Sequence, residues 1–183
     1  MLSTASATSS LFAGSINDGA FRTLSFYKDG VGVLGLSGAS NYTGVTKVYQ
    51  GALSVSHGSA LGATSGSTVV FAGAALRIAG GITSGEPLFL AGAGVAGTGV
   101  LRNLSGANTF SGAIALSAPS RFVSDAGTLT LGANALASLT SGAQGHVING
   151  GTVALTGSGD NPLFINYPSS GSFFFSGQRM NVN

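Results

Sequence analysis

Residues 104–112 read Leu104-Ser-Gly-Ala-Asn-Thr-Phe-Ser-Gly112, and a closely similar stretch precedes them as Leu36-Ser-Gly-Ala-Ser-Asn-Tyr-Thr-Gly44. The two stretches align without a gap, and the offset between them is 104 − 36 = 68. Each follows a Gly-Val-Leu segment, at residues 32–34 and 99–101. A pattern that returns along the chain in this way indicates stacked copies of one structural unit.

A second pair of segments returns at a similar distance. Pro87-Leu-Phe-Leu90 matches Pro162-Leu-Phe-Ile165, and here the offset is 162 − 87 = 75. One turn of a β-solenoid takes roughly 20–25 residues, so a unit of this length contains about three turns. By the same measure, a chain of 183 residues contains about eight turns.

We therefore expect a single β-solenoid domain that spans residues 1–183. Its repeat units are expected at about 31–97 and 98–165, and the flanking segments 1–30 and 166–183 are candidate ends or caps.

The composition favours strands over helices. Only 7% of the residues are charged, 44% are hydrophobic, 31 are Gly, and there is no Cys and no Trp. A surface helix needs a charged face opposite its apolar stripe, and no segment has one. Short runs bounded by small residues, at 68–71, 75–78 and 128–131, are instead typical of strands. The sequence therefore predicts an all-β fold.

The motif around residue 108 resembles a known family. Residues 104–112, followed by Ala126-Gly-Thr-Leu-Thr-Leu-Gly132, are similar to the autotransporter-associated β-strand repeat. The earlier copy departs from that pattern, with Ser40-Asn-Tyr42 in place of Asn-Thr-Phe and Gly51-Ala-Leu-Ser-Val55 as the later strand. The likeness is strongest over residues 34–62 and 98–132.

This resemblance implies a single-stranded right-handed parallel β-helix, displayed at or released from a bacterial surface. We expect a structural or adhesive role rather than an enzymatic one. We expect an extracellular or cell-surface protein that self-associates through its solenoid ends into head-to-tail filaments and contacts surface glycans or host matrix. The alternative is a carbohydrate-binding or polysaccharide-degrading β-helix.

The acidic residues argue against polysaccharide degradation. Glycoside hydrolysis uses two carboxylates at a defined separation. The separations 125 − 86 = 39 and 160 − 125 = 35 do not match one solenoid turn, so stacking of these acids on one face is not expected. The complete set of acids is Asp18, Asp29, Glu86, Asp125 and Asp160. We expect no catalytic residues.

No cofactor or metal site is expected either. His57 and His146 are far apart in the sequence (146 − 57 = 89), there is no Cys, and zinc sites need three or four ligands. The glycine-rich segment 92–97 has no helix pattern after it, so we interpret its glycines as corners and not as a dinucleotide fingerprint.

The distribution of charged and apolar residues argues against nucleic acid and membrane as partners. The net charge is +2, and the seven basic residues never form a run, whereas nucleic-acid binding needs clustered Lys and Arg. The longest apolar stretch, 87–101, is broken by Gly and is shorter than the roughly 20 residues of a membrane helix. Neither nucleic-acid binding nor membrane insertion is expected.

Three further features of the sequence concern aromatic residues and threonines. Tyr42 and Phe110, at equivalent repeat positions, are interpreted as an internal aromatic stack, with ligand stacking as the alternative. Phe173-Phe-Phe175 cannot place all three rings on one side of a strand, so it predicts a capped or contact-making end. Thr128 and Thr130 form only one Thr pair, so no ice-binding ladder is expected.

Overall fold

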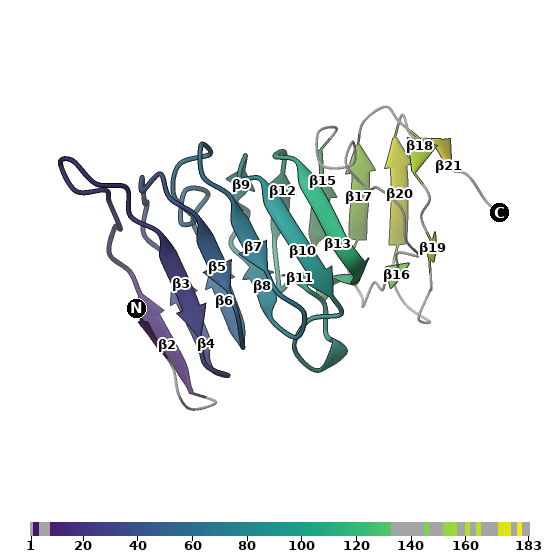
Figure 1. The fold of residues 1–183 in the computed structure, drawn as a ribbon. Helices are drawn as coiled ribbons and strands as arrows, with labels where there is room; N and C mark the ends of the chain where they lie inside the picture. Colours follow the sequence, from purple (N-terminus) through teal and green to yellow (C-terminus); the bar gives the residue numbers. More distant parts are fainter. Residues whose placement is uncertain are drawn as a thin grey trace.

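The computed structural model shows a parallel β-solenoid, which confirms the predicted fold class (Figure 1). The structure describes residues 2–3, 8–132, 145–146, 152–156, 160–161, 164–165, 172–176 and 179–180, with side chains for 8–132 and 152–154. Within this part, the one helical segment is a single 3₁₀ turn, η1 (Val95–Gly97). None of the described helices is long and apolar enough to span a membrane.

Three parallel sheets form the sides of the coil. Sheet 1 contains, in order, β1 (Leu2–Ser3), β3 (Phe26–Asp29), β5 (Thr46–Val48), β7 (Thr68–Val70), β10 (Leu88–Gly92) and β13 (Ile114–Ser120). Sheet 2 contains β2 (Ser9–Phe12), β4 (Val33–Leu36), β6 (Ala52–Val55), β8 (Ala75–Ile78), β11 (Leu101–Asn103) and β14 (Phe122–Ser124). Sheet 3 contains β9 (Thr83–Ser84), β12 (Ala107–Phe110), β15 (Thr128–Leu131), β17 (Thr152–Thr156) and β20 (Ser172–Ser176).

Two short parallel pairs complete the described strands. One joins β16 (Gly145–His146) to β19 (Phe164–Ile165), and the other joins β18 (Asp160–Asn161) to β21 (Arg179–Met180). The strands expected from the runs at 68–71, 75–78 and 128–131 are confirmed as β7, β8 and β15.

Within the described residues the stack has about six turns, against the eight or so expected for the chain of 183 residues. Among the described strands, sheets 1 and 2 contain six each, the last being β13 and β14, and sheet 3 continues through β17 and β20. Some turns are also longer than average: Leu88 pairs with Ile114, so the chain advances by 114 − 88 = 26 over that turn. The other steps in sheet 1 are shorter (46 − 26 = 20, 68 − 46 = 22, 88 − 68 = 20), so the turns are unequal in length.

The core consists of columns of inward side chains. In sheet 2, Leu34, Leu53, Leu76 and Leu101 are paired in successive turns, and each is at most 1% exposed. Leu34 and Leu101 belong to the two Gly-Val-Leu copies, so the repeat unit does span three turns. Leucines stacked on leucines bury apolar surface between every pair of turns, which is the main favourable contribution to folding.

The sequence alignment and the sheet register differ by one residue after this point. The ladder places Leu36 in the column of Val55, Ile78 and Asn103, whereas the ungapped alignment pairs it with Leu104. The later copy therefore has one extra residue at the corner. The later copy also forms β12 in sheet 3, where the earlier copy has no strand.

Glycine permits the close stacking of the corners between sheets 1 and 2. Gly51 has a φ of +63°, and a Cβ there would overlap the carbonyl oxygens of Gly30 and Gly32 in the preceding turn. Only glycine adopts this conformation at little cost, and only a residue without a side chain lets the two corners touch.

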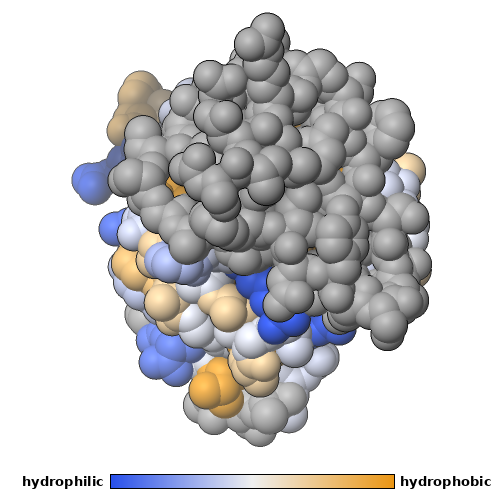
Figure 2. All heavy atoms as spheres, turned by 90° about the vertical axis from the view of Figure 1, so that its right-hand side faces the viewer, coloured by the Kyte–Doolittle hydropathy of each residue, from blue (hydrophilic) through white to orange (hydrophobic). Residues whose placement is uncertain are grey.

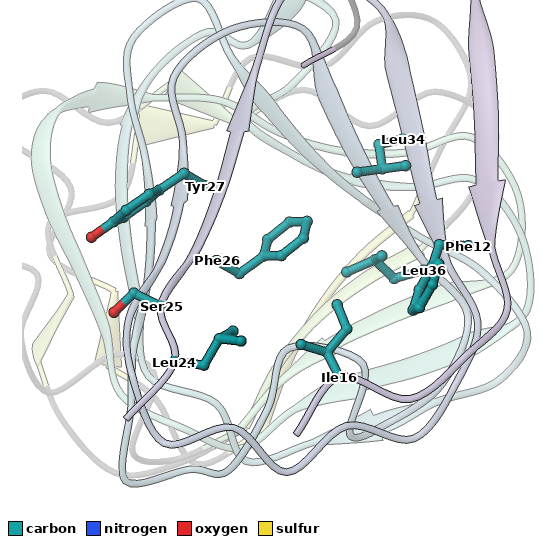
Figure 3. A pocket seen from close by; sticks show the side chains of 8 residues that line it. All are labelled: Phe12, Ile16, Leu24, Ser25, Phe26, Tyr27, Leu34 and Leu36. Carbon is teal, nitrogen blue, oxygen red and sulfur yellow. The ribbon is translucent and has the colours of Figure 1, made fainter. Parts of the chain in front are cut away.

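A hollow with a volume of about 200 Å³ lies beside β2, β3 and β4. Figure 3 looks into this hollow: Ile16, Leu24, Phe26 and Leu36 point into the coil, while Tyr27 points away from it. The alternation of Phe26 and Tyr27 in one strand thus separates the core from the outer face of sheet 1.

Candidate ligand-binding face

Asp18 has a structural role in the loop before β3. Its carboxylate accepts hydrogen bonds from Thr43 Oγ1 (2.6 Å) and Leu24 N (2.7 Å), and these bonds lower the pKa of Asp18. The loop that follows presents Phe21, which is 99% exposed. Asp18 therefore connects this loop to the neighbouring turn.

Glu86 lies inside the coil and is 2% exposed. Its Oε1 accepts a hydrogen bond from Thr68 Oγ1 (3.0 Å), while Oε2 is buried without a hydrogen-bond partner. Burial raises the pKa of Glu86 to about 7, against a weaker lowering by the Thr68 hydroxyl. Nearby, the Tyr42 and Thr46 hydroxyls share a hydrogen bond, and burial raises the pKa of Tyr42 to about 12. Glu86, Tyr42 and Thr46 are all buried in the interior of the coil.

Arginines that are distant in sequence lie on neighbouring turns of sheet 2. Arg77 and Arg102 are paired positions, and Arg102 Nε donates to Asp125 Oδ2 at 2.7 Å. Burial lowers the pKa of Arg77, as does the adjacent Arg102 charge. On the side shown in Figure 2, hydrophilic residues of the described part form separate patches among pale and hydrophobic ones. These cations form a short column rather than a wide basic face.

The described acids are not brought together. Asp18, Glu86 and Asp125 have the separate environments given above, and Asp29 accepts a hydrogen bond from the adjacent Gly30 N (2.8 Å). Asp160 lies in β18, and its side chain is outside the described residues. The described part of the chain therefore contains no pair of carboxylates in contact.

The two histidines also lie apart. His57 Nδ1 accepts a hydrogen bond from Ser59 N (3.1 Å), so its imidazole holds a tight turn. The side chain of His146, in β16, is not among those described. Across the described residues, no group of three or more His, Cys, Asp or Glu side chains is placed to hold a metal ion.

The glycine-rich segment 92–97 forms the connection from β10 to β11. Gly92, Gly94 and Gly97 all have positive φ, and no helix longer than the η1 turn follows them within the described part of the chain. These glycines therefore lie in the connection between two strands, as expected for corner residues.

Tyr42 and Phe110 are both fully buried. Their interpretation as internal aromatics is therefore confirmed, and ligand stacking on them is excluded. They do not form the expected stack with each other in any described ring contact. Tyr42 instead lies against Phe26, with ring centroids 6.4 Å apart.

A different set of aromatic residues faces solvent on sheet 1. We define the aromatic strip as Tyr27, Tyr49, Phe71 and Phe89, which are 37%, 41%, 38% and 47% exposed. Tyr27 and Phe89 lie within β3 and β10, each between two inward side chains. Tyr49 and Phe71 directly follow β5 and β7, where their N–H groups donate to the preceding turn at Lys28 O (2.9 Å) and Val48 O (3.0 Å). The strip therefore runs along the stack, with one ring on each of four successive turns.

Ring contacts join three members of the strip. Tyr49 and Phe71 are stacked with centroids 4.8 Å apart and planes 12° apart, and Tyr27 lies 6.3 Å from Tyr49 at 52°. These are the offset and tilted arrangements that aromatic pairs prefer. Contact with a neighbouring ring limits the freedom of these three side chains, so this part of the strip is organised before any ligand arrives.

The strip carries little charge. Tyr27, Lys47, Val69 and Phe89 form one outward column, and the Lys47 ammonium lies 5.9 Å from the centre of the Tyr27 ring. A cation over an aromatic face is held by the ring's quadrupole. Lys47 is therefore directed toward the strip and not away from it.

The sequence contains a signal for the strip that composition alone does not reveal. Tyr27, Tyr49 and Phe71 follow one another at a constant step (49 − 27 = 22, 71 − 49 = 22), which is close to the length of one solenoid turn. A search for aromatic residues at this period predicts three of the four members. Phe89 is missed because it pairs with Val69 and not with Phe71, so it follows Phe71 by only 89 − 71 = 18.

In sheet 3, more threonines pair between successive turns than the sequence suggests. Thr83, Thr109 and Thr130 are paired in successive turns, and Thr128 pairs with Thr152. The expectation that Thr128 and Thr130 stand alone as a pair is therefore wrong, because register brings together threonines that are distant in the sequence (130 − 109 = 21, 109 − 83 = 26). The array is short and is followed by Ala154.

Phe173-Phe-Phe175 forms part of β20, which pairs with β17. The side chains of these three residues lie outside the described residues, so the expected outward aromatic stays a prediction.

Comparison of the chain with family models, curated proteins and solved structures gives no match. The likeness of residues 104–112 and 126–132 to the autotransporter-associated repeat therefore remains a resemblance, which rests on the quoted motif and on a solenoid fold that agrees with it.

Proposed function

We propose that this chain is a surface-displayed or secreted bacterial β-solenoid with an adhesive role, in which the aromatic strip is the contact face. The coil supplies a rigid support, and the strip supplies a row of rings fixed on successive turns. The composition and the motif at 104–112 support the surface location. The separate environments of the described acids support a non-enzymatic role.

The observation that carries this proposal is the exposure of four rings on successive turns. Apolar surface in water is unfavourable by about 25 cal/mol for each Å². Contiguous exposed apolar patches commonly mark interaction sites. The same sheet buries Phe26, Leu88 and Leu90 inside the coil, so outward rings of comparable size are a departure from its pattern.

Adherence of cells that display the chain tests the proposal. The chain is displayed on a non-adherent bacterium, and adherence is counted on polysaccharide films, on matrix-protein films and on bare plastic. We expect adherence to at least one biological film, reduced at least fivefold by the double substitution Tyr49→Ser and Phe71→Ser. Phe21→Ser is the matched control, because it removes an exposed ring away from the strip and should leave adherence unchanged.

Equal display of all variants is verified by antibody labelling. Adherence that does not exceed that of cells without the chain, or that is unchanged in the double variant, would refute the adhesive role of the strip.

Self-association through the solenoid ends into filaments is a separate part of the proposed role. Stacked solenoids expose strand edges at their ends, and such edges are templates for further strands. Light scattering over a hundredfold range of concentration tests it. A mass that rises with concentration supports end-to-end assembly, and a constant monomer mass refutes it.

A further inference from the structure

We infer that the aromatic strip binds a neutral polysaccharide chain laid along the solenoid axis. This inference rests on the proposed function and names the ligand class of the same face. The strip is narrow and four turns long, so a ligand that contacts all four rings must itself be long and narrow.

The exposed area favours a chain ligand over a folded protein. Aromatic side chains bury 150–250 Å² each, so four rings that are 37–47% exposed offer roughly 300 Å². A specific protein–protein interface buries about 800 Å² on each partner. The strip alone is therefore too small for a stable complex with a globular partner.

The position on a sheet face disfavours an extended peptide. Peptides that bind β-structure pair their main chain with a sheet edge. The strands of the strip are interior to sheet 1, where β5 pairs with β3 and β7, and β7 pairs with β5 and β10. A peptide on this face could not extend the sheet, so it would lack the main-chain hydrogen bonds that give affinity in that binding mode.

A sugar ring suits the strip better. A pyranose presents C–H groups on its faces and hydroxyls around its perimeter. The C–H faces can lie on the partly exposed rings while the hydroxyls stay in water or reach the Tyr27 and Tyr49 hydroxyls. Such contacts need no buried main-chain hydrogen bonds.

The electrostatics favour a neutral chain. Lys47 is the one cation in the outward column of Tyr27, Val69 and Phe89, and it already lies over the Tyr27 ring. An acidic polysaccharide would need a repeated row of cations to match its repeated charges. The described residues of the strip contain no such row.

Binding of the purified chain to soluble polysaccharides tests the inference. Isothermal titration calorimetry is run with a β-glucan, a xyloglucan, a galactomannan and an α-glucan, and with alginate as the anionic comparison. We expect at least one neutral polysaccharide to bind, with at least tenfold weaker affinity for the Tyr49→Ser and Phe71→Ser double variant. Phe21→Ser should bind as the unchanged chain does.

A second variant, Phe89→Ser, changes the strip at a different position, so weaker binding by both variants cannot be attributed to misfolding of the double variant. Each protein must also unfold at the same temperature as the unchanged chain. Binding of no neutral polysaccharide, stronger binding of alginate, or neutral binding that ignores both strip variants would overturn the inference. If cell adherence to protein films still depends on the strip, the proposed function stands and only the ligand class is wrong.

Discussion

Among single residues, Glu86 makes the stability of the coil depend on pH. Its pKa rises from 4.5 to about 7 on burial, so between these values the folded chain holds a proton that the unfolded chain has released. Folding then takes up a proton, and stability falls as pH rises through this window. A shift of this size corresponds to about 3 kcal/mol, since one pKa unit corresponds to about 1.4 kcal/mol.

Glu86→Gln is expected to abolish this dependence, because the amide stays neutral and can still accept from Thr68 Oγ1. Urea unfolding at pH 4.5, 6 and 8 measures it: the unchanged chain should lose stability across the series and the variant should not. Asp18→Asn is the control. The pKa of Asp18 is lowered from 3.8, so its contribution is present above that value and is lost only in more acidic solution. A slope between pH 4.5 and 7 that survives in Glu86→Gln would contradict the assignment.

Asn108 is a second residue whose buried side chain decides local structure. It is fully buried, its Oδ1 accepts from Ile82 N at 2.7 Å, and its Nδ2 donates to Asn103 Oδ1 at 2.6 Å. Asn108→Ala leaves the Ile82 N–H buried without a partner, so we expect a loss of about 1–3 kcal/mol. Chemical denaturation measures it, and Thr109→Ala, a part-exposed neighbour, should stay within about 0.5 kcal/mol.

Among the elements, the corners limit which residues the coil accepts. Gly51→Ala must adopt a positive φ and also overlap the carbonyl oxygens of the preceding turn, so we expect a loss of at least ~2 kcal/mol. Gly73 has a φ of +85° but no atom within 4 Å of the place a Cβ would take, so Gly73→Ala should cost only about 1–2 kcal/mol.

Gly19 has neither a positive φ nor a neighbour within 4 Å, so Gly19→Ala should be close to neutral. The three variants together separate the cost of backbone conformation from the cost of stacking, read as differences in the free energy of unfolding. Equal losses at Gly51 and Gly73 would show that contact between corners contributes nothing.

In the molecule as a whole, the position of a residue along the stack sets how much it contributes to stability. Leu76 has leucines of the same column on both sides, in β6 and β11, so Leu76→Ala should leave a cavity and cost about 3–5 kcal/mol. Leu34 lines the existing hollow beside β2, so Leu34→Ala should cost less, about 2 kcal/mol. Thermal and urea unfolding of both variants measure the order, and an equal or reversed order would contradict it.

The class of this fold could be predicted from the amino acids alone. Scarce charge and frequent Gly excluded surface helices, and the two pairs of repeated segments indicated stacked turns, because side chains that recur at one period can stack on like side chains. The inward leucines, the corner glycines and the buried Tyr42 and Phe110 all follow from that period.

The register between neighbouring turns, by contrast, is known only from the tertiary structure. That register decides which side chains lie next to one another in the candidate site. The turns are unequal in length, with a step of 53 − 34 = 19 from Leu34 to Leu53 and of 114 − 88 = 26 from Leu88 to Ile114, and this shifts which residues meet. It decides that Phe89 pairs with Val69 in the column of Tyr27 and Lys47, and that Thr109 pairs with Thr83. Local sequence decides which side of a strand a residue faces, but the length of each connection decides what lies beside it.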